Sequence, residues 1–171
     1  MSNKRWEFTG DTKVCFGITL KRIRATVEFK IKCGIIIRKG ELGGWIEKGS
    51  NLSGDAWVSG DAWVYDDAEV SGDARVSGNA RVYGDAWVSG DAEVHGNARV
   101  KSSKDYCVYK NTWSSFRWFT YTRSNKMWAV GCFYGTGAKL IAKAYKDSEK
   151  SGKCYEAIVK AQEAIEKAME A

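Results

Sequence analysis

The chain has 171 residues, a formal net charge of +6, five cysteines and no proline. Its length suits one domain or a short solenoid with small end pieces. No apolar run approaches the roughly 20 residues that a membrane-spanning helix needs, so we expect no membrane insertion. None of the cysteines forms a C-x-x-C pair, which argues against a zinc site. Their odd number and the absence of an apolar leader predict reduced thiols in a cytoplasm.

The charge is unevenly distributed along the chain. Residues 1–49 carry eleven Lys/Arg and five Asp/Glu, residues 50–100 carry three and nine, and residues 101–171 carry thirteen and seven. An acidic middle therefore separates two basic ends. Basic ends could attract an anionic partner, since summed charge steers association, or they could serve solubility alone.

Residues 1–41 read as an N-terminal β segment. Apolar and polar side chains alternate from Ile23 to Ile31, a period of two that is typical of a half-buried strand. The Gly10-Asp11 pair predicts an earlier turn.

Eight six-residue units run without a gap from Gly54 to Lys101, as GDAWVS, GDAWVY, DDAEVS, GDARVS, GNARVY, GDAWVS, GDAEVH and GNARVK. The third position is always Ala and the fifth is always Val. These two side chains point the same way along an extended strand, and the residue between them points outward. Gly-Asp and Gly-Asn are turn dipeptides, so each unit predicts a short strand and a bend. Stacked units of this kind build a β-solenoid, which the register extends back to Leu42.

The segment resembles the hexapeptide-repeat left-handed β-helix family, in which an aliphatic residue is followed four places on by a small one, as from Val58 to Ala62. The run LGGWIEKGSNLS at 42–53, followed by GDAWV-type units, resembles a group of small phage and prophage proteins. The resemblance implies three units per coil, so each residue stacks on the one 18 positions away. It also implies a homo-oligomer, a trimer or dimer, in a host cytoplasm. Handedness comes from the resemblance alone, and a right-handed solenoid stays open.

An 18-residue coil sorts the outward residues into three columns. The columns are Trp45, Trp63, Arg81 and Arg99; Trp57, Arg75 and Glu93; and Asn51, Glu69 and Trp87. Trp–Arg neighbours predict cation–π ladders and Arg75–Glu93 an ion pair. Four tryptophans facing water, beside a Tyr65–Tyr83 column, also predict a surface for a ligand or for a second copy. The expected ligand- or partner-binding residues are Trp45, Trp57, Trp63, Tyr65, Arg75, Arg81, Tyr83, Trp87 and Arg99.

Residues 102–171 read as an α+β module that caps the solenoid. We expect strands at Tyr106–Lys110, Phe116–Arg123 and Met127–Val130, then helices from about Ala138 and from near Lys153. The aromatic, basic stretch from Trp113 to Trp128 is either a stacking surface for bases or the core of this module. Gly135, Gly137 and Lys139 precede the first helix and could hold a phosphate, although a Thr136 N-cap explains them equally well.

The remaining candidates for chemistry are weaker. Aspartates stack in the turns as Asp55, Asp73 and Asp91, and as Asp67 and Asp85, but they lack calcium-loop spacing, so we expect no metal. Acyltransferases of the resembled family use a histidine as general base, and His95 is the one histidine. The sequence shows no partner or cleft for it.

The sequence thus predicts a mainly β protein, a short β-solenoid over residues 42–101 between an N-terminal β segment and a C-terminal α+β module over 102–171. We expect a non-catalytic binding protein without a cofactor, an inhibitor or sequestering protein for a nucleotide, a nucleic acid or a host protein. The alternatives are acyl transfer through His95 and a purely structural oligomerising module.

Overall fold

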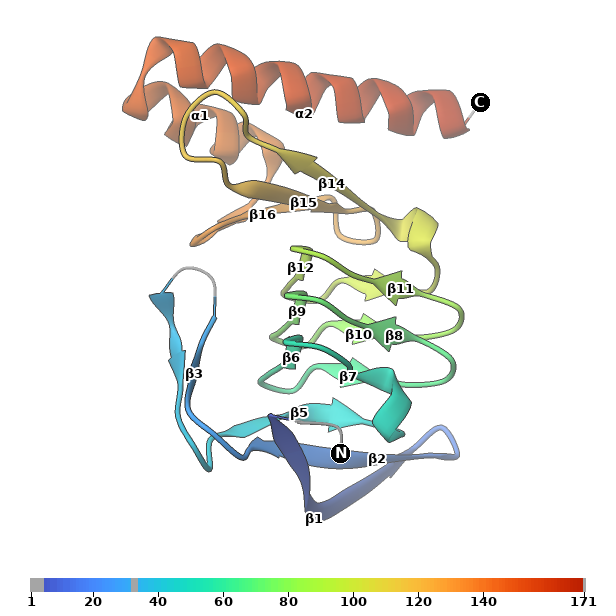
Figure 1. Cartoon of the computed structure of the whole chain (residues 1–171). Helices are drawn as coiled ribbons and strands as arrows, with labels where there is room; N and C mark the ends of the chain where they lie inside the picture. Colours follow the sequence, from blue (N-terminus) through green and yellow to red (C-terminus); the bar gives the residue numbers. More distant parts are fainter. Residues whose placement is uncertain (1–4, 32–33, 171) are drawn as a thin grey trace.

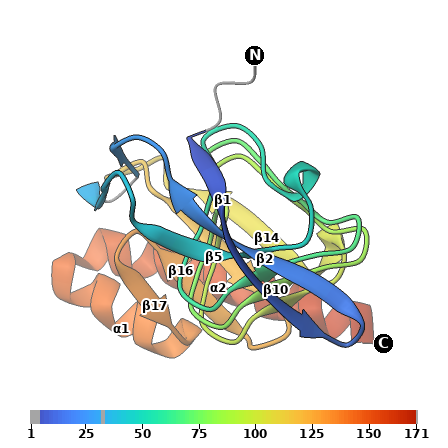
Figure 2. The ribbon, with the colours of Figure 1, turned by 90° about the horizontal axis from the view of Figure 1, so that it is seen from below.

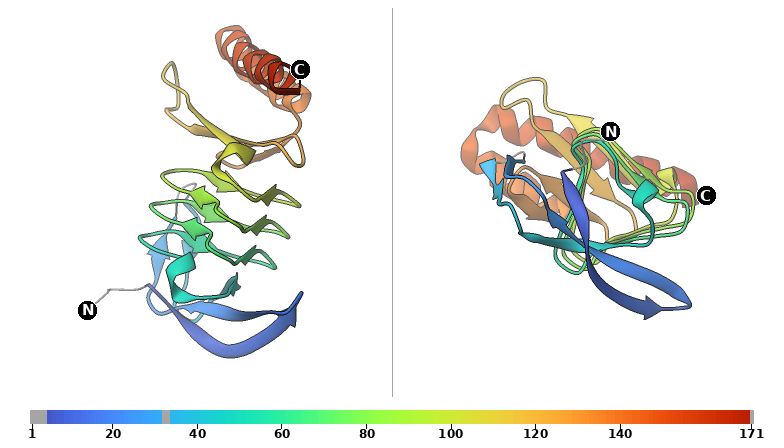
Figure 3. Two further views of the ribbon diagram at one scale, coloured as in Figure 1. Left: turned by 90° about the vertical axis from the view of Figure 1, so that its right-hand side faces the viewer. Right: turned by 60° about the horizontal axis from the view of Figure 1, so that its bottom comes forward.

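The computed structural model describes residues 5–31 and 34–170. It stacks three parts along one axis: strands β1 and β2 at one end, the solenoid in the middle, and a sheet covered by two helices at the other end (Figure 1). The chain is mainly β, as the repeat predicts, and the stacked coils are seen edge-on in Figure 3. No helix within the described part of the chain is long and apolar enough to cross a membrane.

The solenoid consists of short parallel strands that pair at a spacing of 18 residues. One face continues from β5 through β7 and β10 to β13, a second face comprises β6, β9 and β12, and a third comprises β8 and β11. The strands are β5 (Leu42–Ile46), β6 (Trp57–Val58), β7 (Trp63–Val64), β8 (Glu69–Val70), β9 (Arg75–Val76), β10 (Arg81–Val82), β11 (Trp87–Val88), β12 (Glu93–Val94) and β13 (Arg99–Val100). Seen along the axis, successive coils lie over one another (Figure 2).

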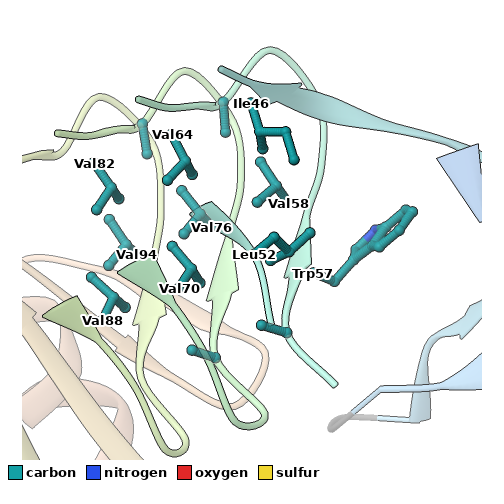
Figure 4. Close-up of a cluster of buried hydrophobic side chains, with 14 of the residues drawn as sticks. Ile46, Leu52, Trp57, Val58, Val64, Val70, Val76, Val82, Val88 and Val94 are labelled. Atoms are coloured by element: carbon teal, nitrogen blue, oxygen red, sulfur yellow. The ribbon is translucent and has the colours of Figure 1, made fainter. Parts of the chain in front are cut away.

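The repeated Ala and Val side chains fill the inside of the coils. Every one of them from Ala56 to Val100 is at most 4% exposed, and Ile46 and Leu52 extend the same column at the first coil. Figure 4 shows the valines stacked inside the coil. Burial of a Val side chain stabilises a fold by about 1.5–3 kcal/mol, so the column supplies much of the stability of a rod only about three coils long.

The bends between strands depend on glycines with a left-handed backbone. Gly72 and Gly90 have φ of +67° and +64°, and they stack one coil apart. A Cβ on Gly72 would lie 3.0 Å from the backbone nitrogen of Gly90, whereas a Cβ on Gly90 would meet nothing within 4 Å. The two sites therefore share the backbone strain and differ in the space available for a side chain.

We expect Gly72→Ala to destabilise the protein more than Gly90→Ala. Both variants bear the left-handed cost of about 1–2 kcal/mol, but only Gly72→Ala forces the next coil to move. Urea unfolding of the two variants measures the difference. Equal losses would show that close stacking of the turns contributes nothing beyond the backbone conformation.

The N-terminal segment extends the first face of the solenoid. β1 (Trp6–Cys15) pairs antiparallel with β2 (Ile18–Ala25), which pairs antiparallel with β5, so one six-stranded sheet runs from β1 to β13. The turn predicted at Gly10-Asp11 is wrong. β1 passes through this pair with an irregular register, and Phe16 and Gly17, both at positive φ, make the turn instead.

A small hairpin, β3 (Phe29–Lys30) with β4 (Ile36–Ile37), stands beside the second face of the solenoid (Figure 1). Phe29 packs edge-on against Trp57, with ring centroids 5.4 Å apart. Trp57 points away from the valine column (Figure 4) and is still only 1% exposed. The hairpin therefore buries a tryptophan that the repeat directs outward.

The C-terminal module is a four-stranded antiparallel sheet with two helices. The strands are β14 (Tyr106–Lys110), β15 (Trp118–Thr122), β16 (Met127–Val130) and β17 (Phe133–Gly135), and the helices are α1 (Gly137–Asp147) and α2 (Glu149–Glu170). The prediction for α2 placed its start near Lys153 and is wrong by one turn. Ser148 accepts a hydrogen bond from the backbone of Ser151 and caps the helix earlier, while Gly152 leaves room for the Tyr145 ring.

Two short 3-10 turns, Gly49–Asn51 and Ser103–Asp105, flank the repeat. The second turn leads into the C-terminal sheet, and β12 and β13, which precede this turn, dock under that sheet. The backbone nitrogen of Glu93 donates to Thr120 Oγ1 at 2.9 Å, and that of Arg99 donates to Ser124 Oγ at 2.7 Å. The module thus satisfies donors that the last coil would otherwise expose, which supports the expected capping role.

Candidate functional site

Six of the nine expected binding residues lie together on the first face of the solenoid. Trp45, Trp63, Arg81 and Arg99 are cross-strand neighbours in register, one on each of β5, β7, β10 and β13. Tyr65 and Tyr83 form the adjacent column, with their rings stacked 5.2 Å apart and only 6° from parallel. The 18-residue spacing is therefore confirmed on this face.

Two cations from the N-terminal strands join this row. Arg22 on β2 lies opposite Trp45 in the sheet, and its guanidinium is 5.2 Å from the Trp45 ring. Lys13 on β1 places its ammonium 4.0 Å from the Trp45 ring and 4.4 Å from the Trp63 ring. Neither residue could be predicted to lie here from the sequence, because nothing in the repeat tells which face of the solenoid the preceding strands extend.

Arg81 completes the arrangement from the other side, 4.3 Å from the Trp63 ring. This contact confirms the predicted Trp63–Arg81 cation–π pair. Arg99, one strand further, is exposed at the end of the row. We name Lys13, Arg22, Arg81 and Arg99 the cation row. Its members come from β1, β2, β10 and β13, and three of them contact the Trp45 and Trp63 rings of β5 and β7 between them.

The cation row carries charge that its surroundings leave largely uncompensated. Within residues 5–31 and 34–170, no member of the row forms a salt bridge. Burial lowers the pKa of Lys13, Asp61 partly opposes this, and Arg22 and Arg81 lower it further. Like charges opposite one another on neighbouring strands, such as Arg81 and Arg99, destabilise a sheet. An anion along the row would relieve that repulsion.

The other expected binding residues lie on the two remaining faces. Trp57 was expected to face water and does not, because the β3–β4 hairpin covers it. Arg75 sits beside it in the sheet and faces Glu93, with Nη1 3.5 Å from Oε1, which confirms the predicted ion pair. Trp87 is 58% exposed on the third face, as expected.

Asn51 was expected to point outward in the Trp87 column, and this expectation is wrong. Its side chain is fully buried, and its amide donates to the backbone oxygens of Asp66 and Ala68 at 3.1 and 2.7 Å. The first coil has a 3-10 turn where later coils have a strand, so the side chain turns inward and bonds the next coil.

The segment before α1 is explained by capping and packing. Thr136 is the N-cap, and its hydroxyl accepts from the backbone of Lys139 at 3.4 Å. A Cβ on Gly137 would lie 2.6 Å from Val159, and a Cβ on Gly135 would lie 2.9 Å from the Phe133 ring. These glycines are needed for packing, and Lys139 lies on the helical layer rather than in the cation row.

The stretch from Trp113 to Trp128 was expected to be either a stacking surface for bases or the core of the C-terminal module, and it contains residues of both kinds. Phe119, Tyr121 and Trp128 form the core of the C-terminal module, at 0%, 5% and 2% exposure. Phe116 and Arg117 remain exposed. Most of the aromatic side chains therefore serve packing, as the core interpretation predicts.

Two of the turn aspartates form ion pairs with basic side chains. Asp55 pairs with Arg5 at 3.0 Å, and Asp67 pairs with Lys48 at 2.8 Å. No group of His, Cys, Asp and Glu in the described residues has the arrangement of a metal site.

His95 has neighbours that its position in the repeat did not reveal. Nδ1 lies 2.5 Å from Ser77 Oγ, one coil below, and Nε2 lies 3.5 Å from Glu93 Oε2. Its backbone oxygen accepts from the hydroxyl of Tyr134 at 3.2 Å, and the two rings are 5.8 Å apart. His95 is thus held at the seam between the last coil and the C-terminal module.

The comparisons with known proteins bear on the repeat. A search of curated proteins found no match to this chain. Residues 74–96 match the family model described as the YdcK beta solenoid repeat. The match covers β9 to β12 and agrees with the coil geometry, so the chain is similar to YdcK-type β-solenoid repeat proteins over this part of its length.

Proposed function

We propose that the protein is a non-catalytic binding protein that holds single-stranded nucleic acid along the cation row. The observation that supports this most directly is a row of four cations, on β1, β2, β10 and β13 of one sheet, with no salt-bridge partner among the described residues. Phosphates of a nucleic-acid strand are the natural counterions for such a line.

The length of the row favours an extended ligand over a single nucleotide. Arg22 and Arg99 are separated by four strand-to-strand steps, which amounts to about 19 Å at the usual inter-strand spacing. A strand crossing this distance places several phosphates against the row. One nucleotide would leave most of the cations unmatched.

The aromatic side chains supply the second element of such a surface. Tyr65 and Tyr83 are partly exposed beside the row, and the exposed guanidinium of Arg99 offers a plane at its end. Bases stack on aromatic rings and guanidinium planes without sequence preference. Trp45 and Trp63 are engaged by Lys13, Arg22 and Arg81, so they position the cations instead of contacting bases.

The test is binding of a fluorescently labelled 12-mer of deoxythymidylate, followed by anisotropy, with the same length of duplex DNA as comparison. We expect the single strand to bind and to bind more tightly than the duplex, because the tyrosines reach only unstacked bases. Absence of single-strand binding at low salt, together with recovery of a host protein on the immobilised chain, would replace this proposal with the protein-binding alternative.

The resemblance to hexapeptide-repeat phage proteins supports a more specific role. We propose that the chain is of the phage type and acts in the host cytoplasm as an inhibitor that sequesters its ligand. Trp87 is the exposed tryptophan of the repeat and offers a contact for a second copy in a dimer or trimer, and light scattering tests this.

Acyl transfer has one observation in its favour, the contact of His95 with Ser77 and its proximity to Glu93. A histidine oriented by two polar neighbours is one element of a general base. If His95→Ala abolished an acyl-CoA-dependent activity of the purified protein, the binding-protein proposal would be wrong. We expect instead that this variant binds the 12-mer as the wild type does.

A further inference from the structure

A cavity of about 360 Å³ opens where the last coil meets the C-terminal module. Asp91 and Glu93 line it from the solenoid, and Phe116, Arg117 and Trp118 line it from the segment that leads into β15. This volume lies within the range of about 300–1,000 Å³ that is typical of small-molecule sites. The cavity is on the β12 side of the molecule, and its lining includes no residue of the cation row.

Glu93 brings a buried acceptor to this cavity. The residue is 9% exposed, and its backbone is fixed by the hydrogen bond to Thr120. Within the described residues, its Oε2 atom is buried without a hydrogen-bond partner. His95 Nε2 is 3.5 Å from that atom and does not meet hydrogen-bond geometry. Buried carboxylate oxygens are normally paired, so a shift of the Glu93 side chain toward the cavity would let a ligand N–H complete the site.

The opposite wall offers flat apolar surface. Phe116 is 65% exposed and has φ of +54°, a backbone conformation that is strained for a bulky residue. The half-buried Trp118 ring lies nearby in the chain, with the Lys110 ammonium 5.0 Å from it. A strained, exposed aromatic at the rim of a cavity is accounted for when a flat ring stacks on it.

The charges around the cavity select among flat ligands. Two carboxylates, Asp91 and Glu93, line the cavity. Arg75 pairs with Glu93 from outside the lining, and Arg117 is part of the lining. Arg117 lies over Gly131 and forms no salt bridge among residues 5–31 and 34–170. Among the lining residues, Arg117 carries the guanidinium, so an anionic substituent suits Arg117 and a neutral ring with N–H donors suits Glu93.

We infer that this cavity binds a purine mononucleotide whose ring edge carries adjacent N–H donors, as guanine does. The ring stacks on Phe116, its N–H groups donate to Glu93, and the phosphate meets Arg117. A carboxylate is the acceptor that such an edge prefers, and a bidentate contact of this kind discriminates by about 1–3 kcal/mol between bases, or about tenfold and more. The site is separate from the cation row and does not depend on nucleic-acid binding there.

Calorimetric titration with guanosine 5′-monophosphate tests the inference. Inosine 5′-monophosphate, which lacks one of the N–H donors, should bind about tenfold more weakly, and ribose 5-phosphate should give no signal. Glu93→Gln and Phe116→Ala should each weaken guanosine 5′-monophosphate about tenfold. Phe116 is exposed, so its variant should keep the fold even if loss of the Arg75 contact destabilises Glu93→Gln; thermal melting checks both.

Arg81→Gln/Arg99→Gln is the matched control, because it alters the cation row and leaves the cavity intact. It should bind guanosine 5′-monophosphate as the wild type does. The inference is overturned if guanosine 5′-monophosphate fails to bind at millimolar concentration, if ribose 5-phosphate binds equally well, or if the cavity variants bind unchanged. Loss of binding in the row variant would place the nucleotide on the cation row instead.

Discussion

Trp57→Ala is expected to destabilise the protein by about 3–5 kcal/mol, the largest loss we expect from a single tryptophan replacement in the solenoid. Trp57 is 1% exposed although it lies on the outside of the coil, because Phe29 of the β3–β4 hairpin packs against its ring. Its removal leaves a cavity between two parts of the chain that are far apart in sequence. Guanidinium unfolding followed by circular dichroism measures the loss.

Trp87→Ala is the matched control for this prediction. Trp87 occupies the equivalent position of its repeat unit, but it is 58% exposed on the third face. We expect its replacement to change the free energy of unfolding by less than about 1 kcal/mol. Similar losses for the two variants would mean that the hairpin does not clamp the second face.

Arg81→Gln/Arg99→Gln is expected to weaken binding of the deoxythymidylate 12-mer by about 30-fold or more. Each contact to phosphate contributes about 1 kcal/mol or more, and two are removed together. Stability should be little changed, because the variant removes the repulsion between the two arginines and also the contact of Arg81 with the Trp63 ring, two effects of opposite sign. Anisotropy titration at fixed low salt measures the effect.

Lys153→Gln/Lys160→Gln removes the same net charge from α2 and is the control for this variant. Both lysines are exposed and pair with glutamates one turn away, so the fold should tolerate their loss. If this control weakens binding as much as the Arg81/Arg99 variant, net charge rather than the cation row attracts the nucleic acid.

The coil could be predicted from the sequence because every repeat unit has the same buried positions and the same turn residues. Ala and Val at fixed positions define an inside, and Gly before Asp or Asn defines each bend, so the column of Trp63, Arg81 and Arg99 follows once an 18-residue coil is assumed. Strand Tyr106–Lys110 and strand Met127–Val130 could also be predicted, since their alternation is local.

Which outward side chains of the coil are covered by the N-terminal segment could not be predicted. Trp57 and Trp45 occupy the same position of the repeat unit, yet one is buried by a hairpin and the other is held by Lys13 and Arg22. These contacts depend on where the residues before the repeat pack against the solenoid. The periodicity of the repeat gives no information about that packing. Asn51 likewise turned inward because the first coil replaces a strand with a 3-10 turn.

The salt dependence of single-strand binding tests the central claim most directly. If phosphates contact the four cations of the row, the logarithm of the binding constant for the 12-mer should fall with the logarithm of salt concentration with a slope of about −2.8. Arg81→Gln/Arg99→Gln should make that slope shallower by about 1.4. A wild-type slope near zero, or an unchanged slope in the variant, would contradict the assignment of the cation row as the nucleic-acid-binding surface.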